Sequence, residues 1–148
     1  MFLITATSVA QAKASHASQQ AIVIKLDQFE KGPWFQSEME WHSACMALGL
    51  VNNLLATKKK PSVTLFLNLQ GVFLADAMEP IENKQCGMMG SLDKLWNQFR
   101  KAGGKVMVCP GCAKIAGLEQ DDLREGSVLG NHHSVGSLFL RANKVIDY

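Results

Sequence analysis

Two cysteines that are three positions apart are the residues of this sequence best suited to chemistry. Cys109 and Cys112 lie in the segment Val-Cys-Pro-Gly-Cys-Ala-Lys, residues 108–114. The thiolate is the nucleophilic form of cysteine, and the thiol pKa of about 8.5 falls at a helix N-terminus or beside a cation. Lys114 provides a cation in the same stretch. The pattern therefore predicts a reactive thiol at Cys109, with Cys112 close enough to face it.

The residues on either side of Cys109 predict a junction between a strand and a helix. Residues 106–108 have the apolar character of a short buried strand, and 113–116 are compatible with a helical turn. Pro110 and Gly111 allow the chain to bend between them. The crevice of an open parallel sheet lies outside the carboxyl ends of its strands, where helix N-termini direct unpaired N–H groups. We therefore expect Cys109 to lie at such a crevice.

Several blocks of the sequence together carry a resemblance to a known family. They are residues 63–68, 71–75, 108–112, 116–118, 122–123, 125–126 and 142–148. In these blocks the chain resembles the DsrE/TusD-like (DsrE/DsrF-like) sulfur-carrier proteins, over about residues 21–148 and with the blocks in the order found in the family. Ala116 stands where an arginine is common in the family, and many members lack a counterpart of Cys112.

The resemblance implies a function for Cys109. In the family, the cysteine eight positions before the glycine of a conserved turn carries a persulfide, and counting back from Gly117 selects Cys109. The resemblance also implies a sulfur-relay protein that needs no cofactor and exchanges sulfur with donor and acceptor proteins or with small persulfides. It further implies a homo-oligomer or a complex with related subunits.

The alternation of short apolar strands with helical segments predicts how the cysteines are positioned. We expect an α/β fold, a three-layer α/β/α sandwich around a mainly parallel five-stranded sheet, as in DsrE-like proteins. The expected strands are residues 21–26, 63–69, 106–108, 127–129 and 144–148. The expected helices are residues 38–57, 71–78 and 92–102, followed by a last helix capped by Ser134.

Other polar residues and cysteines are candidates for supporting roles. Asn68 and Gln70 end the second expected strand, where they form either a polar wall of the crevice or an ordinary turn. Cys86 lies in residues 79–90, which we expect to be a mobile loop. There it is either a thiol that resolves a sulfur adduct on Cys109 or an uninvolved surface cysteine. Cys45 lies on the apolar stripe of the helix predicted at 38–57, where we expect it to act as a small hydrophobic residue.

Three alternatives to sulfur relay fit the same residues. Cys-Pro-Gly-Cys at a strand-to-helix junction is typical of dithiol–disulfide oxidoreductases, although their motif usually follows the first strands of a domain. Cys109 and Cys112 could also bind zinc together with His132 and His133, as a tetrahedral set of ligands. The third alternative is a non-catalytic subunit of an assembly.

The composition argues against nucleic-acid binding and against a membrane-spanning protein. A chain of 148 residues, 47% hydrophobic and 19% charged, fits a single globular domain. The net charge of +2 is too small to indicate nucleic-acid binding. The longest apolar run, residues 44–51, is much shorter than the ~20 residues of a membrane span.

The first twenty residues are expected to be a leader outside the domain formed by residues 21–148. Residues 1–10 are apolar, and Ala10-Gln11-Ala12 has the spacing of small residues found at signal-peptidase sites. Residues 1–14 are therefore either the remnant of a signal peptide or part of a disordered leader. The first alternative predicts a periplasmic protein and the second a cytoplasmic one.

Overall fold

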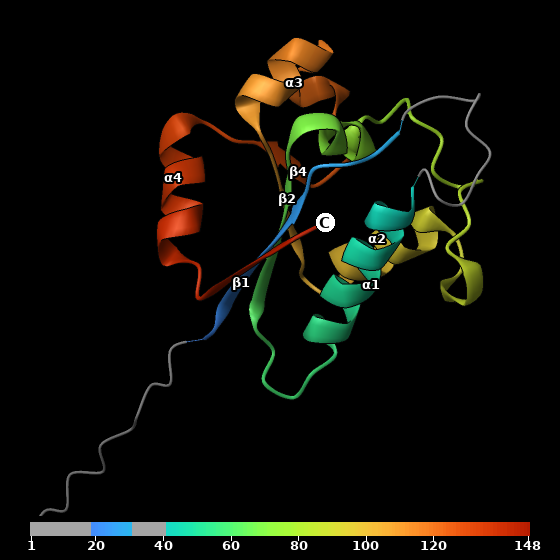
Figure 1. Ribbon diagram of the computed structural model, residues 1–148, viewed down its shortest axis with the longest axis vertical. Helices are drawn as coiled ribbons and strands as arrows, with labels where there is room; N and C mark the ends of the chain where they lie inside the picture. The colour runs from blue at the N-terminus through green and yellow to red at the C-terminus, as the bar shows by residue number, and fades with distance from the viewer. Residues whose placement is uncertain (1–18, 31–40) are drawn as a thin grey trace, which may run out of the picture.

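A computed structural model describes residues 19–30 and 41–148 and contains a parallel sheet at its centre (Figure 1). The strands of the sheet are β1 (Ala21–Leu26), β2 (Ser62–Leu67), β3 (Lys105–Val108), β4 (Ser127–Leu129) and β5 (Lys144–Asp147). Their order is β4-β3-β2-β1-β5, and every neighbouring pair is parallel. The predicted α/β fold with a five-stranded parallel sheet is confirmed.

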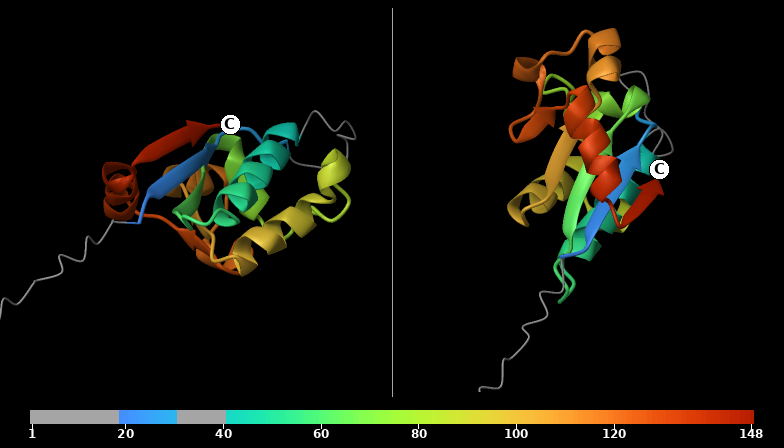
Figure 2. Two further views of the ribbon diagram at one scale, coloured as in Figure 1. Left: turned by 90° about the horizontal axis from the view of Figure 1, so that it is seen from below. Right: turned by 90° about the vertical axis from the view of Figure 1, so that its left-hand side faces the viewer.

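Helices cover both faces of this sheet. The α-helices are α1 (His42–Leu55), α2 (Leu92–Lys101), α3 (Pro110–Ala116) and α4 (His132–Arg141), and the 3-10 helices are η1 (Leu69–Ala75), η2 (Gly87–Met89) and η3 (Gln120–Asp122). Figure 2 shows α1 and α2 on one side of the sheet and α4 on the other, which gives three layers. Across the described residues, no helix combines the length and the apolar character needed to cross a membrane.

The core lies mainly between the sheet and the layer of α1 and α2. The central strand β2 is almost completely buried, and α1 packs Ala44, Leu48 and Val51 against the sheet. On the opposite face, α4 has no buried residue, and its Phe139 meets Phe66 of β2 edge to face, with ring centroids 5.1 Å apart. The apolar spacing that predicted these helices therefore marks the side chains that attach them to the sheet.

Several element boundaries differ from those expected. Helix α1 begins at His42 and ends at Leu55; the expected start at residue 38 lies outside the described residues. Helix α4 is capped by Asn131, whose side chain accepts from the Ser134 N–H at 2.9 Å. Ser134 is therefore the third helical residue, and its Oγ accepts in return from the Asn131 N–H at 2.8 Å. Such reciprocal capping boxes place polar residues at both positions, which is why spacing alone selected the wrong cap.

Two boundary differences bear directly on the cysteines. Strand β2 ends at Leu67, so Asn68 is the first residue beyond it, and η1 starts at the next residue. Helix α3 begins at Pro110, directly after Cys109, rather than near residue 113. Proline at the first helical position is favoured because its missing N–H would have no partner there and its φ angle already suits a helix.

Candidate functional site

Three polar side chains stand next to one another at the carboxyl edge of the sheet. Asp27, Asn68 and Cys109 are each the first residue after a strand, β1, β2 and β3 respectively. The backbone N–H of Asn68 donates to the last carbonyl of β1 at 2.9 Å, and that of Cys109 donates to the last carbonyl of β2 at 2.9 Å. These bonds extend the parallel ladder by one step, so residues that are about forty positions apart become neighbours.

The two free thiols belong to the first turn of α3. Cys109 is the N-cap residue, with extended φ and ψ angles of −61° and 121°, and its carbonyl accepts from the Ala113 N–H at 2.9 Å. Cys112 is the third helical residue, a position whose side chain lies beside that of the N-cap residue. Both cysteines are free and partly buried. The predicted junction and the predicted proximity of the two cysteines along one turn therefore agree with the structure.

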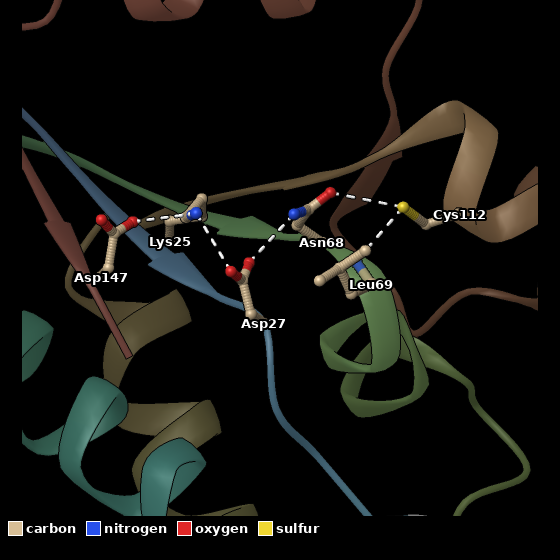
Figure 3. A network of polar contacts seen from close by, with 6 residues as sticks. All are labelled: Lys25, Asp27, Asn68, Leu69, Cys112 and Asp147. Atoms are coloured by element: carbon tan, nitrogen blue, oxygen red, sulfur yellow. Dashed lines mark hydrogen bonds and ion pairs between the residues drawn. The ribbon is translucent and has the colours of Figure 1, made fainter.

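The Cys112 thiol is held from two sides by the start of η1 (Figure 3). The backbone N–H of Leu69 donates to its Sγ at 3.2 Å, and the Sγ donates to Oδ1 of Asn68 at 3.3 Å. The Asn68 amide nitrogen donates to Oδ1 of Asp27 at 3.0 Å. An ionised carboxylate only accepts hydrogen bonds, so it requires the amide nitrogen on its side and leaves the amide oxygen facing Cys112.

Ion pairs continue this network to the edge of the sheet. Nζ of Lys25, on β1, lies 3.0 Å from Asp27 and 3.1 Å from Asp147 of β5. Hydrogen bonds to these two carboxylates raise the pKa of Lys25. Figure 3 shows the resulting chain of contacts from Asp147 through Lys25, Asp27 and Asn68 to Cys112. We call these five residues the edge network.

The environment of Cys112 favours its protonated form. Burial raises the pKa of its thiol, as does the side-chain hydrogen bond with Cys109, whereas the Leu69 N–H lowers it. The charge of Asp27 adds a smaller effect that also raises the pKa. The net shift is upward, so Cys112 retains its proton at neutral pH.

The backbone that contacts Cys112 adopts an unusual conformation. Leu69 has a φ of 47°, in the left-handed region, which costs a residue with a side chain about 1–2 kcal/mol. Gly71 lets η1 fold back against the end of β1, since a Cβ at this position would lie 2.1 Å from the Leu26 carbonyl oxygen. Strained backbone of this kind is concentrated at functional sites, where the surrounding structure maintains it. Here it directs the Leu69 N–H to the thiol.

Other predicted site residues lie outside this arrangement. Lys114 is exposed in the last turn of α3, not in the first turn beside the thiols. Gln70 is exposed in η1 and is not part of the edge network, whereas Asn68 is. His132 and His133 are exposed at the start of α4, and in the described part of the chain no three potential ligands gather around a metal position. The structure therefore does not assemble the alternative zinc set of Cys109, Cys112, His132 and His133.

The other two cysteines form a disulfide. Cys45 of α1 and Cys86 are bonded, with Cα atoms 5.5 Å apart, and are only 3% and 8% exposed. The interpretation of Cys86 as a resolving thiol or an uninvolved surface cysteine is therefore wrong. Cys45 lies in the hydrophobic core, as its place on the apolar stripe predicted, and the disulfide is an addition to that prediction. The positions of cysteines in a sequence do not determine which of them pair.

Residues 79–90 are attached to the body of the domain rather than forming the expected mobile loop. Besides the disulfide, the indole N–H of Trp41 donates to the Gln85 carbonyl at 2.8 Å. Nζ of Lys84 lies 2.9 Å from the Glu79 carboxylate, and both side chains are more than 90% buried. The expectation of a mobile loop rested on the polar composition of this segment. Two of its charged residues, Lys84 and Glu79, are instead buried and paired with each other.

Sequence reasoning missed three members of the edge network: Lys25, Asp27 and Asp147. A usable signal was present for Asp27, because it directly follows the first strand just as Asn68 and Cys109 follow theirs. Residues in that position of neighbouring parallel strands meet at the same edge of a sheet. The contact between Lys25 and Asp147 depends on β5 pairing with β1, which the sequence does not specify.

Comparisons with known proteins agree with this architecture. The model of a family described as DsrE/DsrF-like matches residues 43–148. The crystal structure of the YchN protein from E. coli is 17% identical and has a TM-score of 0.59, covering 88% of this chain and 100% of that chain. The structure of MTH1491 from Methanobacterium thermoautotrophicum, a protein of unknown function, is 16% identical with a TM-score of 0.63 and the same coverage. These two likenesses show the fold alone, and no curated protein matches the chain.

Proposed function

Because this chain belongs to the DsrE/DsrF-like family, we propose that it is a sulfur-relay protein that carries sulfane sulfur as a persulfide on Cys109. The observation that supports this function is the position of a free, partly exposed Cys109 at the carboxyl edge of the sheet, on the first turn of a helix. Family membership is consistent with sulfur relay, and the persulfide on this residue is the specific proposal.

The proposed reaction consists of two thiol exchanges. The Cys109 thiolate attacks the outer sulfur of a donor persulfide, forming a new S–S bond while the donor departs as a thiolate. An acceptor thiolate then attacks the outer sulfur on Cys109, which returns to its thiolate form. Each step conserves the sulfane sulfur and its oxidation state, so the reaction requires no cofactor.

We infer that the donor and acceptor are proteins or small persulfides that reach Cys109 at this edge. Two apolar side chains on the elements that carry or contact Cys112 are exposed, Leu69 of η1 at 58% and Ile115 of α3 at 91%. Exposed apolar groups next to a reactive atom suit a transient protein contact. We also propose that the protein forms a homo-oligomer or associates with related subunits, which measurement of its mass in solution tests.

Intact mass spectrometry tests the relay. After brief exposure to a small persulfide donor and an acid quench, the protein should gain about 32 Da, the mass of one sulfur atom, on the peptide that contains Cys109. A Cys109→Ser variant should gain none, and a Cys112→Ser variant should still gain it. An adduct that persists in Cys109→Ser would contradict the assignment.

A second candidate function is dithiol–disulfide exchange by Cys109 and Cys112. The placement of two free thiols in the first turn of one helix favours it, because Cys-x-x-Cys at a helix start is the arrangement of dithiol oxidoreductases. This function predicts turnover of a disulfide substrate and a reduction potential between about −270 and −120 mV, as in thioredoxin-like catalysts. Sulfur uptake by Cys109 without such turnover favours relay.

A further inference from the structure

We propose that Cys112 resolves the Cys109 persulfide within the same chain, releasing sulfide and leaving a disulfide between Cys109 and Cys112. This inference rests on the proposed persulfide on Cys109 and adds a second outcome for it. The protein would then deliver sulfur in two forms, as sulfane sulfur to an acceptor thiol or as free sulfide.

The geometry of α3 brings the two sulfur atoms together. Cys109 is the N-cap residue and Cys112 the third helical residue, so their side chains share one helical turn. Cys112 is fixed from the opposite side by the Leu69 N–H at 3.2 Å and by Oδ1 of Asn68 at 3.3 Å. Cys112 is thus held beside the atom that it would attack.

No other thiol of the chain is available for this step. The sequence contains four cysteines, and two of them, Cys45 and Cys86, are already bonded to each other. Cys109 carries the sulfur in the proposed function, which leaves Cys112 as the single free thiol. Resolution within one chain therefore has to use Cys112.

The proposed step is balanced without an added oxidant. The thiol proton of Cys112 passes to the anionic outer sulfur of the Cys109 persulfide, which leaves Cys112 as the nucleophilic thiolate. Sγ of Cys112 then attacks Sγ of Cys109, so a bond forms between them while the bond from Cys109 to the outer sulfur breaks, and the outer sulfur departs with the bonding electron pair as HS⁻. The sulfane sulfur is thereby reduced to sulfide, and the two cysteines are oxidised to a disulfide. A thiol reductant of the surroundings is needed only to restore the dithiol.

The edge network supplies the proton for this step. Asp27 fixes the Asn68 amide so that its oxygen accepts the Cys112 S–H, which keeps that thiol protonated while Cys109 is loaded. An anionic outer sulfur cannot depart readily unless it is protonated, since it would otherwise leave with a double charge. Cys112 therefore gives up its proton only after sulfur has been loaded onto Cys109, because the outer sulfur of the persulfide is the group that accepts this proton.

Measurement of sulfide and of protein mass tests the inference. The dithiol form of the full-length protein is loaded with a small persulfide donor, separated from it on a desalting column, and incubated without reductant. Wild type should release about one equivalent of sulfide per chain and end about 2 Da lighter than the starting dithiol, as a new disulfide requires. Cys112→Ser should release no sulfide and keep its adduct of about 32 Da on Cys109.

The rate of sulfide release and the position of the sulfur adduct distinguish a failure of this inference from a failure of the proposed relay. An intramolecular step should have a first-order rate constant that stays unchanged over a tenfold range of protein concentration. Wild type that retains its adduct as long as Cys112→Ser does, or an adduct that moves to Cys112, would overturn the inference and leave the relay intact. Failure of Cys112→Ser to take up sulfur on Cys109 would overturn both proposals.

Discussion

Removing the Cys45–Cys86 disulfide should cost the domain a large part of its stability. The two cysteines are 41 positions apart in the sequence, and the bond restricts the unfolded chain by closing that loop. For a loop of this length, the loss of chain entropy in the unfolded state corresponds to about 4 kcal/mol at 25 °C. We therefore expect Cys45→Ala/Cys86→Ala to lower the free energy of unfolding by about that amount.

Equilibrium unfolding in urea provides the measurement. With a slope of about 2 kcal/mol per molar urea, the loss corresponds to a midpoint about 2 M lower than that of wild type. Dithiothreitol, which reaches the disulfide in unfolded molecules, should shift the wild-type midpoint toward that of the double variant and leave the double variant unchanged. The matched control Cys109→Ser/Cys112→Ser removes two cysteines that are free, and we expect it to change stability by less than about 1 kcal/mol.

Two results would refute this reasoning. The first is a loss of less than about 1 kcal/mol in the double alanine variant, and the second is a wild-type midpoint that does not respond to dithiothreitol. Sulfur uptake by Cys109 should survive in the alanine variant, because neither cysteine belongs to the edge network.

Since disulfides persist in oxidising compartments, this bond also favours the periplasmic alternative, which N-terminal sequencing of native protein would test.

Two further predictions concern the backbone and the charges around Cys112. Replacing the Asp27 carboxylate in Asp27→Asn should lower the pKa of Cys112, because a neighbouring negative charge disfavours a second anion; at a given alkaline pH, peptide mapping should show faster alkylation of Cys112. Asp147→Asn is the control, and an equal acceleration in it, or none in Asp27→Asn, would contradict the role of Asp27. Gly71→Ala should destabilise the domain by at least about 2 kcal/mol in urea unfolding, since the added Cβ would lie 2.1 Å from a carbonyl oxygen of β1. Gly136→Ala, which enters open space within α4, should instead stabilise by about 0.5–1 kcal/mol, and similar effects from both alanines would be incompatible with this account.

Much of the fold could be predicted from the sequence because the relevant signals are local. The apolar character of residues 21–26 and 106–108 selected two strands that the structure contains, and the spacing of Leu92, Leu95 and Phe99 selected the buried face of α2. Cys109 was placed at the end of β3 for the same reason, since a strand, a bend and a helical turn follow one another directly in the chain.

The partners of Cys112 depended on contacts between distant segments. Asp27, Asn68 and Cys112 come from different elements, and they meet only because β1, β2 and β3 lie side by side in that order. The same holds for the bond between Cys45 and Cys86, which joins a helix to a segment 41 positions away. Neither contact leaves a periodic pattern in the sequence.

By itself, therefore, the sequence determined most of the secondary structure, the parallel α/β class and the position of Cys109 at the end of a strand. Only the tertiary structure decided which thiols are free and which backbone N–H contacts Cys112. The physical reason is that hydrophobic periodicity indicates which positions of a helix or strand are buried, but not which residues they contact. Pairing between side chains depends instead on strand order, register and the strained turn at Leu69, which are properties of the whole packed domain.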